Sequence, residues 1–330
     1  DDCNCKDGEK WGRCRINQKW WNDSENSSQV NWETISDFVV ELVRGSIQQG
    51  TEVNAVMFPE LALDWATYDS IARALRDTFP DVSVLVAGVS QDCNDRAGNQ
   101  VVVSTIRDLV DGTRMIETHS RRKHHRWKLD SEQIKTYGLG KVLEPDVTYW
   151  EHLEIEERVL HLDVLRNGAL STAVICEDLA RVDPGLQLLR SIGPSLVFAL
   201  LMDGAQIKDR WPGIYATGLS DDPGSSVLSL TSFGLVERGC KTLSADSDGN
   251  PPSRSVGLWK GPTQPFKSIE LELGSHAILA KLESQQLKVP AMDGRINDVS
   301  HNWEMSETVQ IKLSDEMVEE KGFGWIVDGL

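Results

Sequence analysis

Short apolar-rich runs of strand length alternate with amphipathic helical segments along most of this chain of 330 residues. Apolar residues recur at helical spacing over 32–49 and 66–79, while 53–58 and 82–89 have the length and composition of strands. The alternation continues with strand-like runs at 101–107, 158–165, 170–176, 195–201 and 227–231 and with helical segments at 186–192 and 211–219. This pattern predicts an α/β fold in which two mixed sheets have helices outside them.

The extent of the periodic pattern predicts the domain organisation. We expect one large domain over 13–285, preceded by a polar lead at 1–12 and followed by an acidic, less periodic tail at 286–330. The tail is expected to wrap the domain, to mediate assembly or to be partly disordered. The chain begins at Asp1 and not at Met, which is expected of a processed protein or of one piece of a longer protein.

The charge of the chain disfavours one class of partner. The formal net charge is −17, and an acidic surface repels phosphate backbones, so nucleic-acid binding by the whole surface is not expected. Positive charge is nevertheless concentrated at 121–128, which reads Arg-Arg-Lys-His-His-Arg-Trp-Lys. This segment either supplies counter-charge to internal carboxylates or recognises an anionic substrate or a nucleic-acid partner.

Other classes of protein are also disfavoured by the sequence. No apolar run approaches the roughly 20 residues that cross a bilayer, and the first residues are too polar for a signal peptide. Six cysteines are sparse for this length, so we expect free thiols and a cytoplasmic protein. No metal site is expected, because Cys3, Cys5 and Cys14 lack a second paired cluster and His124 and His125 would point apart on a strand.

Three reactive side chains lie either directly after a strand-like run or within the basic segment. Glu60 follows the run that ends in Met-Phe-Pro, Cys176 follows Ser-Thr-Ala-Val-Ile, and Lys123 lies in the basic segment between them. Strand ends are where α/β scaffolds usually display catalytic groups. Each residue also has a structural explanation: a buried Cys as a small core residue, a Glu after Pro as a helix start, and a basic run as a solvated face.

The three side chains would make chemical sense together. A thiol needs a neighbouring base or cation to become a thiolate near neutral pH, and a carboxylate such as Glu60 can take its proton. A lysine can stabilise the oxyanion of a tetrahedral intermediate, helped by the backbone N–H of the residue after the nucleophile, here Glu177. Together, the three side chains have the chemical groups that acyl transfer needs.

The order of these motifs resembles that of the nitrilase, or carbon–nitrogen hydrolase, superfamily. The matching residues are Phe58-Pro59-Glu60, then Arg122-Lys123-His124-His125, then Val174-Ile175-Cys176-Glu177-Asp178. The resemblance extends from about Arg13 to Leu282, and Ile-Cys-Glu-Asp is most similar to the glutaminase domains of glutamine-dependent NAD synthetases and to some amidases.

The resemblance carries expectations for the fold and for the chemistry. It implies a four-layer α-β-β-α sandwich that assembles as a homodimer or a higher homo-oligomer. It further implies a Glu60-Lys123-Cys176 triad that hydrolyses a small amide, or a related nitrile, without an organic cofactor or a metal. An anionic substrate would fit the basic segment.

The sequence departs from the family pattern at three places. Many members carry a second glutamate after the lysine, for which Glu132 is the best candidate here, although the surrounding residues do not fix the register. Lys128 is a rival to Lys123, which we prefer because Lys-His-His after a short strand is closer to the family pattern. The usual aromatic residue after the cysteine is replaced by Glu177, which leaves the choice of substrate open.

Two alternative functions remain open at this point. The chain is also similar to nitrilase-like domains fused to bacterial defence-associated reverse transcriptases, which would suit a catalytically silent domain for oligomerisation or regulation. A glutaminase that supplies ammonia to a partner is the other alternative, since no synthetase motif lies in these residues. Nucleic acid is expected as a partner only within such a larger fusion.

Overall fold

The computed structural model describes residues 3–4, 10–16, 32–94, 96–155, 157–165, 168–243, 253–290 and 296–327. The chain forms two compact units, which are described separately below. Unit 1 comprises Asp1–Ile16, Arg122–Glu270 and Leu282–Met305. Unit 2 comprises Asn17–Arg121, Leu271–Lys281 and Ser306–Leu330.

Unit 1 is built around a six-stranded mixed sheet. The strand order is β14 (Lys267–Glu270), β13 (Ser255–Lys260), β12 (Ser226–Thr231), β11 (Leu196–Leu201), β10 (Leu170–Ile175) and β9 (Asp163–Val164). The neighbours β10, β11 and β12 run parallel, whereas β9, β13 and β14 pair antiparallel. The three parallel strands are buried at almost every position, as expected of a parallel sheet that is covered on both faces.

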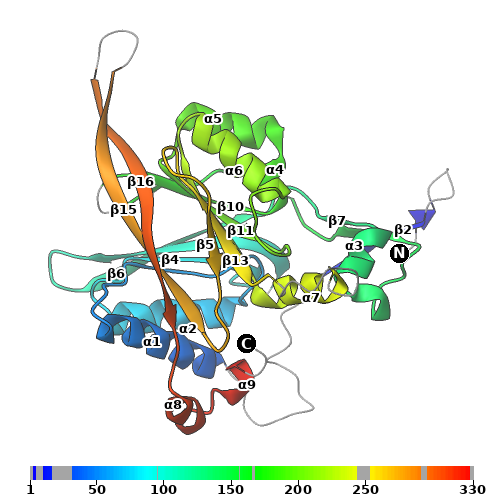
Figure 1. The fold of residues 1–330 in the computed structure, drawn as a ribbon, viewed down its shortest axis with the longest axis horizontal. Coiled ribbons are helices and arrows are strands. Elements are labelled where there is room, and N and C mark those ends of the chain that lie inside the picture. Colours follow the sequence, from blue (N-terminus) through cyan, green and yellow to red (C-terminus); the bar gives the residue numbers. More distant parts are fainter. Residues whose placement is uncertain are drawn as a thin grey trace. The chain divides into compact units, whose positions relative to one another are not determined.

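Helices and one smaller sheet complete unit 1 (Figure 1). The helices are α3 (Ser131–Thr136), α4 (Glu177–Ala180), α5 (Gln187–Ile192), α6 (Trp211–Asp221) and α7 (Phe233–Leu243), with a 3₁₀ turn at Leu139–Lys141 and a π turn at Val182–Leu186. The smaller sheet has the order β1 (Cys3–Asn4), β2 (Lys10–Cys14), β8 (Thr148–Glu151) and β7 (Lys128–Leu129). Its buried face contributes Cys14 and Leu129 to an apolar cluster with Trp127, Ile134 and Tyr137.

Unit 2 pairs a four-stranded sheet with two long helices. The sheet has the order β3 (Ala55–Met57), β4 (Val84–Gln91), β5 (Ala97–Asp108) and β6 (Arg114–Arg122), with β3 parallel and β5 antiparallel to β4. Helices α1 (Trp32–Gln48) and α2 (Trp65–Thr78) lie side by side along the sheet (Figure 1). Asp64 caps α2 by accepting a hydrogen bond from the Thr67 N–H at 2.8 Å. The apolar stripes of both helices pack on the buried residues of the sheet.

The last elements of the chain that the structure describes lie between residues 277 and 327. Strands β15 (Ala277–Pro290) and β16 (Ile296–Ile311) form a two-stranded sheet, followed by α8 (Asp315–Glu320) and α9 (Gly324–Val327). Leu313 and Phe323 are buried against Phe38 of α1. Residue 286, the expected start of the tail, lies within β15, and the division of the chain into one large domain with a tail stays a prediction.

Most of the strands and helices expected from the sequence are present. The α/β class and the mixed sheets are confirmed, whereas the stacking of the sheets into four layers stays a prediction. The strand expected over 158–165 is reduced to Asp163–Val164. Within the described part of the chain, every helix is too short or too polar to cross a lipid bilayer.

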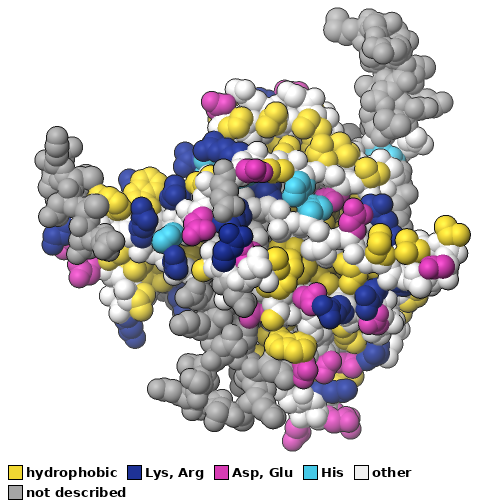
Figure 2. Space-filling model, turned by 180° about the vertical axis from the view of Figure 1, so that it is seen from behind, with side chains coloured by type: hydrophobic (Ala, Val, Ile, Leu, Met, Phe, Trp, Pro, Cys, Tyr) yellow, Lys and Arg dark blue, Asp and Glu magenta, His cyan; other side chains and the backbone are white. Residues whose placement is uncertain are grey.

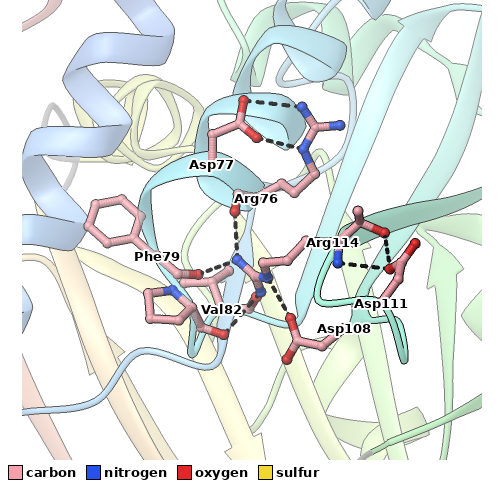
Figure 3. Close-up of polar contacts among 9 residues, drawn as sticks. Arg76, Asp77, Phe79, Val82, Asp108, Asp111 and Arg114 are labelled. Atoms are coloured by element: carbon pink, nitrogen blue, oxygen red, sulfur yellow. Dashed lines mark hydrogen bonds and ion pairs between the residues drawn. The ribbon is translucent and has the colours of Figure 1, made fainter.

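Arg114 ties the end of α2 to the β5–β6 hairpin (Figure 3). Its Nη1 donates to the carbonyl oxygens of Arg76 and Phe79 at 2.6 and 2.8 Å, and its Nη2 donates to those of Pro80 and Val82 at 3.0 and 2.9 Å. The Nε atom donates to Asp108 at 3.0 Å. A planar guanidinium can serve these acceptors at once, whereas a lysine ammonium has only three donors on a flexible stem.

We therefore expect Arg114→Lys to lower the free energy of unfolding by about 1–3 kcal/mol, although the charge is kept. The matched control is Arg107→Lys, because Arg107 is exposed and forms an ion pair with Glu117 at 3.7 Å. That change should stay within about 0.5 kcal/mol. Urea unfolding measures both, and equal midpoints for the two variants would contradict the structural role of Arg114.

Candidate active site

Cys176 lies at a strained turn where β10 meets α4 in unit 1. Its backbone has φ +41° and ψ −111°, a conformation that L residues rarely adopt. Hydrogen bonds hold this turn: the Cys176 N–H donates to the Leu200 carbonyl at 2.9 Å, and the Leu179 N–H donates to the Cys176 carbonyl at 2.9 Å. A strained strand-to-helix turn is a known way to present a nucleophile, since the strain is maintained by the surrounding fold.

Lys123 is a buried cation with a buried carboxylate beside it. It follows β6 directly, and only 1% of its surface is exposed. Its Nζ lies 2.7 Å from Glu151 Oε2, at the end of β8, and the same oxygen accepts a hydrogen bond from the Trp127 N–H at 3.0 Å. Because an uncompensated buried charge is costly, Glu151 offsets the burial of the Lys123 ammonium and holds it in place.

Asp178 connects the Lys123 segment to the Cys176 turn. The buried Asp178 carboxylate accepts hydrogen bonds from the backbone N–H groups of His124 and His125 at 3.1–3.2 Å. It also lies 2.9 Å from His125 Nδ1. Since Asp178 is two residues after Cys176, these contacts bring the residues that follow Lys123 against the turn that carries the thiol.

Glu60 is held in unit 2 by strands β4 and β5. It lies just beyond β3, where the Phe58 N–H donates to the Val86 carbonyl at 2.9 Å. Asn99 of β5 donates through Nδ2 to Glu60 Oε1 at 2.7 Å, and both side chains are buried. The carboxylate is therefore fixed in orientation by a partner 39 positions away.

The close approach of β4 to Glu60 depends on a glycine. A Cβ atom at Gly88 would lie 2.4 Å from Glu60 Cα and 2.5 Å from the Leu61 nitrogen. Both are backbone atoms, so no side-chain rotation relieves the clash. We expect Gly88→Ala to cost about 1–3 kcal/mol of stability and, by displacing Glu60, to lower any hydrolytic activity by about 100-fold.

Gly98 offers a matched control for this prediction. It also lies in the sheet of unit 2, but a Cβ atom there meets nothing within 4 Å. Gly98→Ala should therefore leave stability and activity nearly unchanged. Urea unfolding and steady-state hydrolysis compare the variants, and identical behaviour of the two would refute the tight packing behind Glu60.

The other candidates from the sequence are Lys128, Glu132 and Glu177, and the first two are exposed. Lys128 is exposed on β7, with its Nζ 5.8 Å from the centre of the Trp150 ring. Glu132 is exposed in the first turn of α3, and Glu151 is the carboxylate beside Lys123. Glu177 opens α4, where backbone N–H groups lack partners within a helix, and its side chain lies 3.5 Å from Arg181.

Three functional candidates were missed by the sequence analysis: Asn99, Glu151 and Asp178. Glu151 ends a strand-like stretch, Thr-Tyr-Trp-Glu, and so shares the strand-end signal of Glu60 and Cys176. Asp178 was visible in the motif but had no role there. Asn99 had no local signal, because its role depends on the pairing of β4 with β5.

Cys14 is a second buried thiol in unit 1, and its environment differs. Burial, with a smaller contribution from the Glu151 carboxylate, raises the pKa of the Cys14 thiol to about 11. At neutral pH this thiol stays protonated and unreactive. Cys14 therefore serves as an internal reference for labelling of Cys176.

The members of the expected triad are divided between the two units. Lys123 and Cys176 both belong to unit 1, whereas Glu60 belongs to unit 2. The convergence of Glu60 with the other two therefore stays a prediction. Among the described residues, no three His, Cys, Asp or Glu side chains are grouped as metal ligands would be.

No protein-family model matches the sequence, and no curated protein matches it significantly. Similar solved structures include glutamine-dependent NAD+ synthetase of Acinetobacter baumannii, at 12% identity and a TM-score of 0.45. The match covers 73% of this chain, which spans 41% of the synthetase chain.

Two further structures match along more of their length. Nit3 of Saccharomyces cerevisiae, a member of branch 10 of the nitrilase superfamily, is 12% identical at a TM-score of 0.42, covering 90% of this chain and 88% of Nit3. A CN-hydrolase superfamily protein of Xanthomonas campestris is 11% identical at a TM-score of 0.41. That match covers 97% of this chain and 95% of the Xanthomonas protein.

Proposed function

We propose that this protein is a carbon–nitrogen hydrolase of the nitrilase type, which cleaves a small amide with Cys176 as nucleophile. The observation that carries the proposal is the strained turn at Cys176. Asp178 connects this turn, through its hydrogen bonds to the backbone of His124 and His125, to the segment that carries Lys123. Lys123 itself is buried and paired with a carboxylate. A nucleophile on a strained turn beside a fixed cation is what acyl transfer requires.

In this mechanism, Glu60 takes the proton from the Cys176 thiol and the thiolate attacks the amide carbon. Lys123 and the Glu177 N–H stabilise the resulting oxyanion. When the intermediate collapses, the carbon–nitrogen bond breaks, and the amine leaves with the proton from Glu60. Water, deprotonated by Glu60, then attacks the thioester and releases the carboxylic acid and the Cys176 thiol.

Two roles in this scheme follow from the contacts described above. Glu151 holds the Lys123 ammonium at one place, so the cation does not have to reorganise when the oxyanion forms. Asn99 orients the Glu60 carboxylate by donating to one of its oxygens. A nitrile substrate would follow a related path through a thioimidate.

The test is to trap the acyl enzyme. The protein is quenched in acid during turnover of an amide panel that includes glutamine, and its peptides are weighed by mass spectrometry. We expect an acyl adduct on Cys176 and none on Cys14, whose thiol stays protonated. No turnover and no adduct with any amide would refute the proposal. That result would favour the alternative of a catalytically silent domain for oligomerisation or regulation.

The role of Glu60 is tested without a substrate. Glu60→Gln should slow alkylation of Cys176 by iodoacetamide at pH 7 about tenfold or more, because the thiol loses its base. The control is Glu52→Gln, since Glu52 is an exposed carboxylate of the same unit. Equal alkylation rates for both variants would show that Glu60 does not serve Cys176.

A further inference from the structure

The smaller sheet of unit 1 has one face turned to solvent. In its register, Arg13 of β2 and Lys128 of β7 both pair with Trp150 of β8, so the three side chains project from the same face. All three are exposed. The alternate residues, among them Cys14 and Glu151, are buried on the opposite face.

A second row of side chains on this face repeats the arrangement of Arg13, Trp150 and Lys128. His152 follows β8 by one residue and donates its backbone N–H to the Cys14 carbonyl at 2.8 Å, which places Arg15 beside it. Arg15 Nη2 lies 3.3 Å from His152 Nε2. On the other side, Arg126 donates to the Leu153 carbonyl at 2.9 Å. Both rows therefore have one aromatic ring between two cations: Arg13–Trp150–Lys128 and Arg15–His152–Arg126.

The cations of these two rows are not balanced by carboxylates. Among the residues that the structure describes, Arg13, Arg15, Arg126 and Lys128 form no ion pair. Partial burial, together with the positive charges of Arg15 and Arg13, lowers the pKa of His152, while Glu154 opposes this. That carboxylate already lies 3.3 Å from Arg122.

The rows form a local positive patch on a chain of net charge −17. In Figure 2, Lys and Arg side chains gather among hydrophobic and His side chains at the left of the view. Because this view is from behind, its left side corresponds to the right side of Figure 1, where β2 and β7 lie. Unpaired surface cations repel one another, so an arrangement of this kind is stabilised by a bound anion.

We propose that this sheet face binds single-stranded nucleic acid, with the Trp150 ring stacking on a base and the flanking cations contacting phosphates. Every base has a flat face that can stack on an aromatic ring, and exposed sheet surfaces are a common platform for such stacking. Cations on both sides of the ring would meet the phosphates that flank the stacked base. The proposal does not rest on the hydrolase function.

Other anionic partners fit the face less well. A lipid surface is usually bound through an amphipathic helix whose apolar side chains enter the bilayer, whereas here rigid strands present rings between cations. A duplex hides the faces of its bases, so only its phosphates would be available to Trp150. An acidic peptide would use the cations but not the alternation with aromatic rings.

The test is fluorescence anisotropy with labelled 20-nucleotide DNA and RNA single strands at 50 mM salt. Wild type is expected to bind at least one of them, with a slope of log K against log salt of about −2 to −3 for three or four phosphates. Arg13→Glu combined with Lys128→Glu should weaken binding about tenfold or more. Trp150→Ala should weaken it about 5- to 100-fold, and Trp150→Phe should restore most of the loss.

Matched controls come from unit 2. Arg73→Glu with Arg107→Glu makes the same charge change at exposed arginines that already have carboxylate partners. Trp32→Ala removes another exposed tryptophan. Each control should weaken binding by no more than about half of the fold-change that the matching sheet variant causes. Circular dichroism checks that all variants are folded.

Several results would overturn the proposal. These are no binding of either single strand at 50 mM salt, equal weakening by the control and sheet variants, or a duplex bound as tightly with no effect of Trp150→Ala. Stronger binding to phosphatidylserine vesicles or to a polyglutamate peptide than to the oligonucleotides would also overturn it, in favour of a lipid or a protein partner.

Discussion

Replacing Cys176 by alanine is expected to lower amide hydrolysis on the order of 10⁴-fold or more, because no other group takes over as the nucleophile. The fold should be retained. Alanine and cysteine are equally strained at a φ of +41°, and the hydrogen bonds of the turn use only backbone atoms. We therefore expect the free energy of unfolding to change by no more than about 1 kcal/mol.

The measurement is steady-state hydrolysis of the best amide substrate, paired with urea unfolding. Cys93→Ala is the control, because Cys93 is an exposed thiol of unit 2. It should leave the rate unchanged. If Cys176→Ala keeps more than about a tenth of the wild-type activity, then Cys176 is not the nucleophile and the proposed function is wrong.

Replacing Lys123 by methionine is expected to affect both activity and stability. The oxyanion loses its cation, which should lower kcat about 100- to 1,000-fold. In addition, the buried Glu151 side chain loses the ammonium that lay 2.7 Å away. Breaking such a pair from one side typically costs about 3–5 kcal/mol, which is a large part of the stability of most domains.

The double variant Lys123→Met with Glu151→Gln separates the two effects. A glutamine can still accept the hydrogen bond from the Trp127 N–H but leaves no buried charge. We expect urea unfolding to show that most of the lost stability returns, while hydrolysis stays as low as in Lys123→Met. Recovery of activity along with stability would mean that Lys123 has only a structural role.

Lys128 provides the matched comparison. Its side chain is exposed over Trp150 and has no buried partner among the described residues, so Lys128→Met should have little effect on either unfolding or hydrolysis. If instead Lys128→Met abolished activity and Lys123→Met did not, the assignment of the two lysines would have to be exchanged.

Local patterns in the sequence were sufficient for most of the secondary structure. The helix expected over 66–79 appears as Trp65–Thr78, because its apolar spacing and the capping Asp64 are both local features. The strand over 195–201 appears as Leu196–Leu201 for the same kind of reason. The strand over 158–165 was overestimated, since only its last residues pair with β10.

The tail shows what local patterns leave open. Residues after 286 look acidic and weakly periodic, yet Leu313 and Phe323 are buried against Phe38 near the other end of the chain. Spacing along the sequence does not reveal such a partner. The same applies to the basic segment at 121–128, whose members divide between a buried ion pair and an exposed sheet face once the strands are paired.

The sequence by itself determined the α/β class and which residues stand at the ends of strands, including Glu60 and Cys176. It could do so because strand and helix periodicity, and the residues that end them, are properties of short segments. Only the tertiary structure decided the partners of these residues. Glu151 meets Lys123 across 28 positions, Asn99 meets Glu60 across 39 and Asp178 meets His124 across 54. Contacts of that range depend on which strands become neighbours, and this is set by the packing of the whole unit.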